Sequence, residues 1–120
     1  MNVTETRKAL TGNAVAVPTT IWKAAGELDL EGNAKNAEFL FEGGITAAVY
    51  AGGVGEHDLL SVEQQKELLT AVTGAVRAKG GNPCIGTGLG RTLERGKEMA
   101  PILAELDIAF AMTMPPDIDD

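Results

Sequence analysis

Four short apolar runs recur along the chain, separated by longer segments with a different periodicity. The runs are residues 13–17 (NAVAV), 45–51 (ITAAVYA), 84–86 (CIG) and 108–114 (IAFAMTM). The second run is apolar at nearly every position, as expected for a strand that is covered on both faces. Glycine or proline follows each run or ends it. We therefore expect four strands that end at turns.

The longer segments have the spacing of amphipathic helices. In residues 29–43, Asp29 is the expected N-cap and Gly43 the expected end. A second helix is expected after Ser61, because Ser61 and Gln64 have the spacing of a capping box. The expected apolar stripes are Leu30, Ala34, Ala37 and Phe41 in the first helix, and Leu68, Leu69, Val72, Ala75 and Val76 in the second.

A third helix is expected from about Thr92 to Leu106. The residues predicted to share its apolar face are Leu93, Gly96, Ala100 and Leu103. Pro101 lies inside this segment and should kink or break the helix, since it lacks a backbone N–H. The resulting order, β-α-β-α-β-α-β, predicts an α/β fold with parallel strands. An open doubly wound sheet and part of a (β/α)8 TIM barrel both fit, and both bind ligands at the carboxyl ends of their strands.

Composition narrows the possible functions. The 120 residues form one domain or part of one, and the net charge of −7 argues against a nucleic-acid partner. No apolar run reaches the ~18 residues of a membrane span, so no membrane association is expected. The single cysteine, Cys84, fits a reducing compartment, and with one histidine in the chain a zinc site is not expected.

Glycine clusters follow the second and third runs. Residues 52–56 (GGVGE) come directly after a buried strand, and their backbone N–H groups could hold a carboxylate or a phosphate. A plain turn between strand and helix is the alternative, and the Gly-Lys-Ser/Thr ending of a P-loop is absent. Residues 86–90 (GTGLG) do not fit a dinucleotide fingerprint and are interpreted as a loop. His57 stands between two acidic residues, but a surface or packing role is favoured over acid–base chemistry.

Several motifs, in order, resemble the dihydrodipicolinate synthase/N-acetylneuraminate lyase family. They are residues 26–30 (GELDL), 37–45 (AEFLFEGGI), 52–64 (GGVGEHDLLSVEQ), 83–88 (PCIGTG) and 114–116 (MPP). The third is the most specific. The resemblance implies that residues 1–120 are the N-terminal half of a (β/α)8 barrel, with four strands and three helices. It also implies a lyase or aldolase that acts on pyruvate or a related 2-keto acid through a lysine Schiff base.

The resemblance implies a limited set of site residues in this chain. The backbone amides of Gly53 and Val54 would hold the substrate carboxylate, although Val54 lacks the hydroxyl that the family has there. Thr20 and Glu56 complete the expected substrate-binding set. The family's Schiff-base lysine and catalytic tyrosine belong to later strands, so the 120-residue chain is expected to be inactive by itself. Asp117 and Ile118 replace the family's aromatic pair. The resemblance further implies no cofactor, a cytoplasmic location and a homo-oligomer, often a tetramer.

Two other interpretations remain open at this stage. One is a truncated, non-catalytic protein that binds a small carboxylate or a partner chain. The other is a self-contained α/β domain of flavodoxin-like order that binds phosphate at Gly52–Gly55. Strand order separates the last from a barrel, because a barrel is sequential whereas a doubly wound sheet reverses about its first strand.

Overall fold

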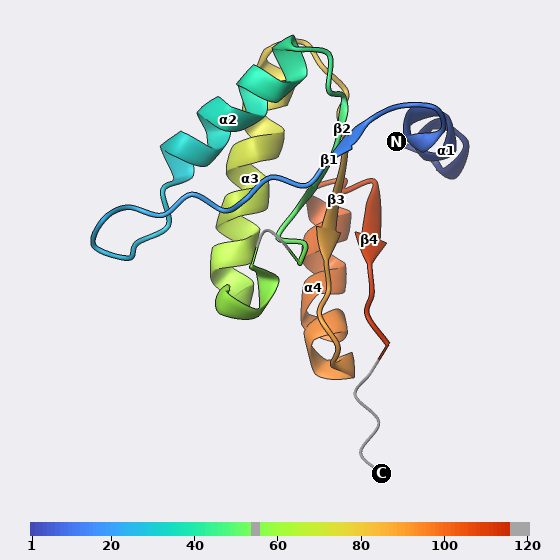
Figure 1. Cartoon of the computed structure of the whole chain (residues 1–120). Helices are drawn as coiled ribbons and strands as arrows, with labels where there is room; N and C mark the ends of the chain where they lie inside the picture. Colours follow the sequence, from blue (N-terminus) through green and yellow to red (C-terminus); the bar gives the residue numbers. More distant parts are fainter. Residues whose placement is uncertain (54–55, 116–120) are drawn as a thin grey trace.

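The computed structural model of the chain describes residues 1–53 and 56–115. Within these ranges, the strands β1 (Val15–Ala16), β2 (Ala47–Tyr50), β3 (Cys84–Gly88) and β4 (Phe110–Met112) form one sheet (Figure 1). All neighbouring strands are parallel, and their order is β1-β2-β3-β4. Sequential order is that of a barrel, so the barrel prediction is confirmed and the flavodoxin-like alternative is wrong.

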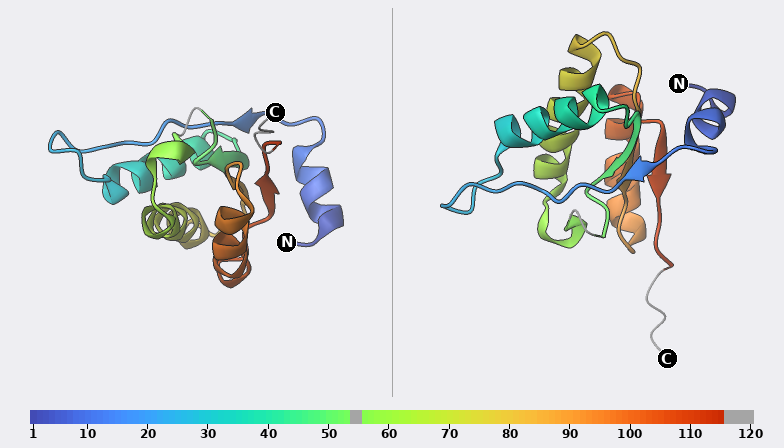
Figure 2. Two further views of the ribbon diagram at one scale, coloured as in Figure 1. Left: turned by 90° about the horizontal axis from the view of Figure 1, so that it is seen from below. Right: turned by 45° about the horizontal axis from the view of Figure 1, so that its top comes forward.

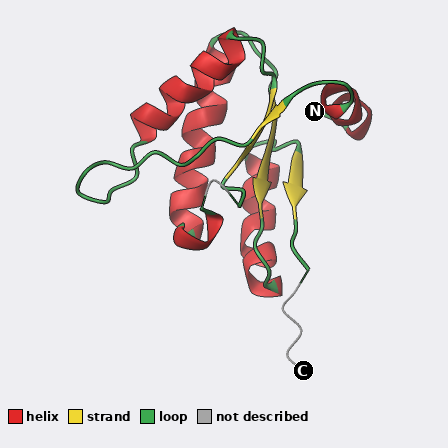
Figure 3. Ribbon diagram, viewed as in Figure 1, coloured by secondary structure: helices red, strands yellow, loops and turns green. Residues whose placement is uncertain are grey.

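Three helices cover the outer face of this curved sheet. They are α2 (Leu30–Glu42), α3 (Val62–Ala78) and α4 (Leu93–Glu105), and Figures 2 and 3 show them as one layer. Ala48, Tyr50 and Ile85 point from the sheet into the core, where they meet α3. The stripe predicted for α3 is confirmed, since its buried residues include Leu68, Leu69, Val72 and Val76. In the described ranges, no helix is long and apolar enough to cross a membrane.

The predicted helix starts are confirmed by their hydrogen bonds. The Asp29 side chain accepts from the backbone N–H of Gly32 at 2.9 Å. Ser61 and Gln64 form a reciprocal capping box, with distances of 3.1 Å and 3.0 Å. Because each cap satisfies backbone donors that have no partner within the helix, these bonds fix where α2 and α3 begin.

The predicted apolar face of α4 is wrong in part. Leu93 is 70% exposed, whereas Met99 is completely buried and Leu103 packs against the core beside it. The helix also continues through Pro101 instead of breaking there. Pro101 lies on the exposed side of α4. On the other side Met99 is buried, and the partly buried residues Ile102, Leu103 and Leu106 pack against the core.

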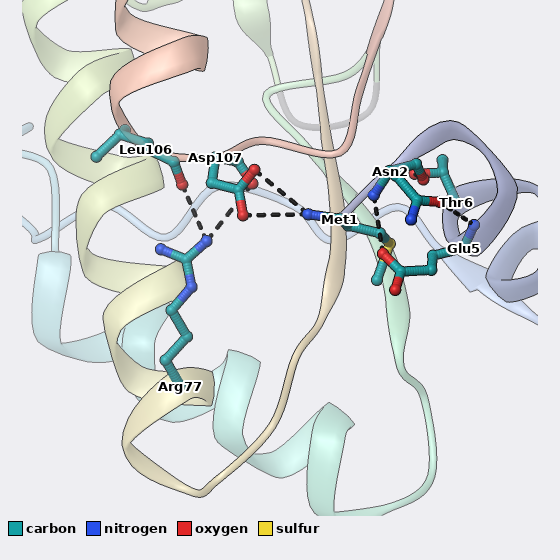
Figure 4. A network of polar contacts seen from close by, with 7 residues as sticks. All are labelled: Met1, Asn2, Glu5, Thr6, Arg77, Leu106 and Asp107. Atoms are coloured by element: carbon teal, nitrogen blue, oxygen red, sulfur yellow. Dashed lines mark hydrogen bonds and ion pairs between the residues drawn. The ribbon is translucent and has the colours of Figure 1, made fainter.

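A further helix, α1 (Val3–Leu10), was not expected from the sequence. It begins with a capping box between Asn2 and Glu5. The ammonium group of Met1, which precedes the helix, lies 3.2 Å from the Asp107 carboxylate, and Arg77 donates to the carbonyl of Leu106 nearby (Figure 4). Since α1 contacts β3, whose outer face is already covered, α1 covers the amino end of the inner face.

Strand β3 is longer than predicted, and packing on the inner face of the sheet explains why. Residues 86–88 belong to β3 and not to the loop that was predicted there. Phe110 is the register partner of Gly86, and a Cβ on Gly86 would lie 2.3 Å from the Phe110 ring. Glycine is therefore needed in this strand to make room for an aromatic side chain, which is a packing role rather than a turn.

Candidate functional site

The loop after β1 is anchored to the start of α2. The amide of Asn33, a buried residue, donates to the Ile21 carbonyl at 3.0 Å, and its oxygen accepts from the Ile21 N–H at 3.1 Å. An isolated antiparallel bridge joins Trp22 to Leu28 within the same loop. Thr20 is buried at the start of the loop. The loop is therefore held in place at the carboxyl end of the sheet, where a substrate-binding residue was predicted.

The loop after β2 turns sharply at the predicted carboxylate-binding motif. Glu56 donates from its backbone N–H to the Gly53 carbonyl, and His57 to the Gly52 carbonyl, each at 3.3 Å. Glu56 has a φ of +60°, a left-handed conformation that is uncommon outside glycine. Gly53 is exposed at the end of the strand. Val54, the second predicted amide donor, lies outside the described residues.

A hydrogen bond joins these two loops. The indole Nε1 of Trp22 donates to Oε2 of Glu56 at 3.0 Å. The predicted site residue Glu56 is thereby held against the loop that contains Thr20, through Trp22, which lies two positions after Thr20. The available signal in the sequence was the single tryptophan, because a partly buried Trp N–H needs an acceptor.

The lone histidine is packed between the loops and contacts its acidic neighbour. His57 Nε2 lies 2.9 Å from Asp58 Oδ1, and Nδ1 lies 3.4 Å from the Gly52 carbonyl oxygen. Only 13% of the side chain is exposed. This burial agrees with the predicted packing role of His57. The contact with Asp58 could not be inferred from the sequence, because neighbouring residues in a loop need not face each other.

A buried polar network supports the loops from below. Gln65 Nε2 donates to Thr87 Oγ1 at 2.7 Å and to the Gly88 carbonyl at 2.6 Å. Arg95 donates to Gln65 Oε1 and, at 2.9 Å, to the Leu60 carbonyl. The network thus ties α3 and α4 to the carboxyl end of β3. Sequence reasoning missed Gln65, although a glutamine three residues before Leu68 is a polar residue on the apolar stripe.

The loops surround a small hollow at the carboxyl ends of β2, β3 and β4. Its volume is about 60 Å³, and its lining residues are Gly52, Gly53, His57, Gly88, Gly90, Met112 and Met114. This is enough for a few water molecules or one small polar group. Of the predicted site residues that the structure describes, Gly53 lines the hollow, whereas Thr20 and Glu56 belong to the adjoining loops.

The six lysines of the chain all lie away from this hollow. All six are in helices or loops, and none is buried. They are Lys8, Lys23, Lys35, Lys66, Lys79 and Lys97. Lys35 pairs with Glu31 at 2.7 Å and Lys79 with Glu42 at 2.9 Å, and these carboxylates raise the pKa of both lysines. A raised pKa disfavours the neutral amine that a nucleophile requires. In residues 1–53 and 56–115, no group of three metal-ligating side chains comes together.

Comparison with known proteins agrees with this geometry. The model of the dihydrodipicolinate synthetase family matches residues 10–101. The chain belongs to this family. No curated protein matches the chain.

Solved structures of family members have the same fold. DHDPS from Cyanidioschyzon merolae, crystallised with lysine bound, is 26% identical over 91% of this chain, with a TM-score of 0.81. Dihydrodipicolinate synthase from Bacillus clausii is 22% identical over 94%, with a TM-score of 0.80. N-acetylneuraminate lyase from Mycoplasma synoviae is 24% identical over 90%, with a TM-score of 0.78. The match covers 37% to 38% of these proteins' own length, as expected for the N-terminal half of such a barrel.

Proposed function

We propose that this chain is the carboxylate-binding part of a lyase barrel that acts on pyruvate or a related 2-keto acid. The observation that carries the proposal is the GGVGE turn, which ends a buried strand beside the hollow. The Gly53 amide, with that of Val54, would hold the substrate carboxylate. Backbone N–H groups at a strand end are suited to an anion, since they offer several donors without a counter-charge.

The loop after β1 would form the second wall of this substrate site. The bond between Trp22 and Glu56 supports this role, because it holds that loop against the GGVGE turn. Glu56 then acts as a positioning residue for the turn, and Thr20 as a polar residue near the substrate. Loss of the family's hydroxyl at Val54 would weaken carboxylate binding by about 0.5–1.5 kcal/mol.

The Schiff-base lysine would come from a part of the barrel that this chain does not contain. None of the six lysines is buried, and Lys35, Lys66 and Lys79 are paired with glutamates, which supports this assignment. Cys84 would be a structural residue, because it is buried in β3 and its burial raises the pKa of the thiol. The single cysteine of the sequence would also suit a cytoplasmic location, where thiols stay reduced. The alternative function is a non-catalytic carboxylate-binding protein, which the departures at Val54 and residues 117–118 favour.

Fluorescence of Trp22 tests the carboxylate site directly, since it is the only tryptophan and is bonded to the GGVGE turn. Titration with pyruvate is expected to change the emission in a saturable way, and titration with acetone, which lacks a carboxylate, is not. Gly53→Pro removes one amide donor and should abolish the response. Gly53→Ala is the matched control, because its methyl group would enter open space and the N–H remains. Equal responses in both variants would contradict the assignment.

Borohydride trapping with pyruvate separates the lyase from the binding protein. On the protein as cells produce it, a reduced pyruvate adduct on a lysine outside residues 1–120 would support the lyase. No adduct, together with an intact fluorescence response, would support the alternative. An adduct on any of the six lysines described above would refute the assignment of the nucleophile to the remainder of the barrel.

A further inference from the structure

One residue, His57, holds the peptide unit between Gly52 and Gly53 from one side. The Gly52 carbonyl oxygen accepts from the backbone N–H of His57 at 3.3 Å, and Nδ1 of the same residue lies 3.4 Å from it. A carbonyl oxygen has two lone pairs, so it can accept from both groups. The backbone and the side chain of His57 can therefore fix the direction of this carbonyl together.

The direction of the Gly52 carbonyl also sets the direction of the Gly53 N–H, because both belong to the same peptide unit. The described residues contain no cis peptide bond, and in a trans unit the N–H points to the side opposite the C=O. No residue in the ranges 1–53 and 56–115 accepts a hydrogen bond from the Gly53 N–H, and Gly53 is exposed. This N–H is thus available to a ligand.

Both ring nitrogens of His57 face an acceptor. Nδ1 faces the Gly52 carbonyl oxygen, and Nε2 lies 2.9 Å from Asp58 Oδ1. Nε2 is buried, and its contact with Asp58 is close without the direction of a regular hydrogen bond, so it depends on charge. A neutral imidazole has one N–H, and the carboxylate attracts it to Nε2, which leaves a lone pair of Nδ1 toward the carbonyl. The protonated ring donates to both acceptors.

The charged groups around the imidazole come from two further places in the fold. Asp58, the next residue in the chain, contacts the ring directly. Arg91, in the loop after β3, and Arg95, on α4, line a cleft of about 300 Å³ together with His57. Arginine keeps its charge and an exposed aspartate is ionised over the range, about pH 5 to 8, in which histidine titrates. His57 is therefore the group of this cleft whose charge changes near neutral pH.

We infer that His57 is a positioning residue for substrate binding, which in its protonated form holds the Gly52 carbonyl and so directs the Gly53 N–H to the substrate carboxylate. The inference rests on the proposed function, since it assigns a role within the same carboxylate site. Donation to the carbonyl also polarises the peptide unit, which strengthens its N–H as a donor. The Nδ1–oxygen distance of 3.4 Å is long for a hydrogen bond and is expected to shorten when the carboxylate binds.

Two amide side chains separate this role from packing. The side-chain nitrogen of asparagine is attached to Cγ, as Nδ1 of histidine is, whereas that of glutamine lies one bond farther out, near the place of Nε2. His57→Asn should therefore keep the donor to Gly52 and bind pyruvate within about twofold of the original protein at about pH 6. His57→Gln, the matched control, and His57→Leu should bind about tenfold more weakly. Isothermal titration calorimetry of the protein as cells produce it measures these affinities, and circular dichroism establishes that each variant is folded.

The pH dependence of binding tests the same role without a substitution. Histidine takes up its second proton between about pH 8 and pH 5, whereas the carboxylate of pyruvate stays ionised. Pyruvate should bind about threefold to tenfold more tightly at about pH 6 than at about pH 8, and by linkage its binding should take up protons between them. Calorimetry in buffers of different ionisation enthalpy measures this uptake. His57→Asn should lack the part that His57 supplies, since an amide does not titrate, so the comparison isolates His57 from other groups.

The outcomes separate this inference from the proposed function. If Gly53→Pro abolishes pyruvate binding but the three His57 variants bind as the original protein does, the inference is wrong and the proposed function stands. Loss of binding in all three folded His57 variants would also overturn it, because the donor to Gly52 is then not what matters. Equal pH dependence and proton uptake in His57→Asn and the original protein would refute the role of the protonated ring. Absence of pyruvate binding in the original protein would overturn both.

Discussion

Gln65 is expected to be the side chain whose polar contacts matter most for the loops of the candidate site. Gln65→Leu keeps a similar volume but removes the donor to Thr87 and Gly88 and the acceptor for Arg95. Two neutral hydrogen bonds at about 1 kcal/mol each and one charged bond at about 1.5–3 kcal/mol are lost. The leucine recovers about 1 kcal/mol through apolar burial. The free energy of unfolding of the variant should therefore be about 2.5–4 kcal/mol lower.

Urea unfolding at a single chain concentration measures this difference. Equal m-values are required for the comparison, because a changed slope signals a changed unfolded or native state. Thr73→Val is the matched control, since Thr73 is also buried on α3 but bonds the carbonyls of its own helix. It should cost less than about 1 kcal/mol. A Gln65→Leu protein as stable as Thr73→Val would refute the view that this network holds the site together.

Two further predictions concern a backbone contact and a buried phenol. Gly88→Ala should cost about 2 kcal/mol or more, because its Cβ would lie 2.4 Å from the Ala51 carbonyl oxygen. The Cβ of a Gly74→Ala variant would meet open space in α3, so this variant should be more stable than the original protein by about 0.5–1 kcal/mol. Chemical unfolding of both variants measures these two changes in stability. Burial raises the pKa of Tyr50 to about 12, above the ~10 of an unfolded chain. Stability from this group is complete below pH ~10 and is lost as pH rises to about 12. Thermal unfolding of Tyr50→Phe should lack this loss, and an identical pH profile would contradict the assignment.

The local elements could be predicted because they depend on spacing within short segments. The capping residues Asp29 and Ser61 satisfy N–H groups only two or three residues away, so their patterns are visible in the sequence. The buried stripe of α3 follows from helical periodicity. The short helix α1 was missed because its charged sequence presents no long apolar stripe, and its position depends on an ion pair with Asp107, far along the chain.

Contacts between elements could not be predicted in this way. Leu93 fits the apolar periodicity of α4, but how the helix is rotated against the sheet is set by packing, and Met99 is the residue buried there. The strand was predicted to end at Gly86 and the glycines after it were interpreted as a loop, because the sequence does not show that Phe110 of another strand fills the space beside Gly86. Likewise, the bond between Trp22 and Glu56 joins loops that are 34 positions apart.

The sequence by itself therefore determined the alternation of strands and helices, the helix starts, the family motifs and the placement of the GGVGE turn after a buried strand. Only the tertiary structure decided the sequential strand order, the bond between the loops after β1 and β2, and the polar network beneath these loops. The physical reason is the range of the interactions. Caps and periodicity act over a few residues, whereas sheet order and loop contacts depend on where segments distant in the chain meet in space.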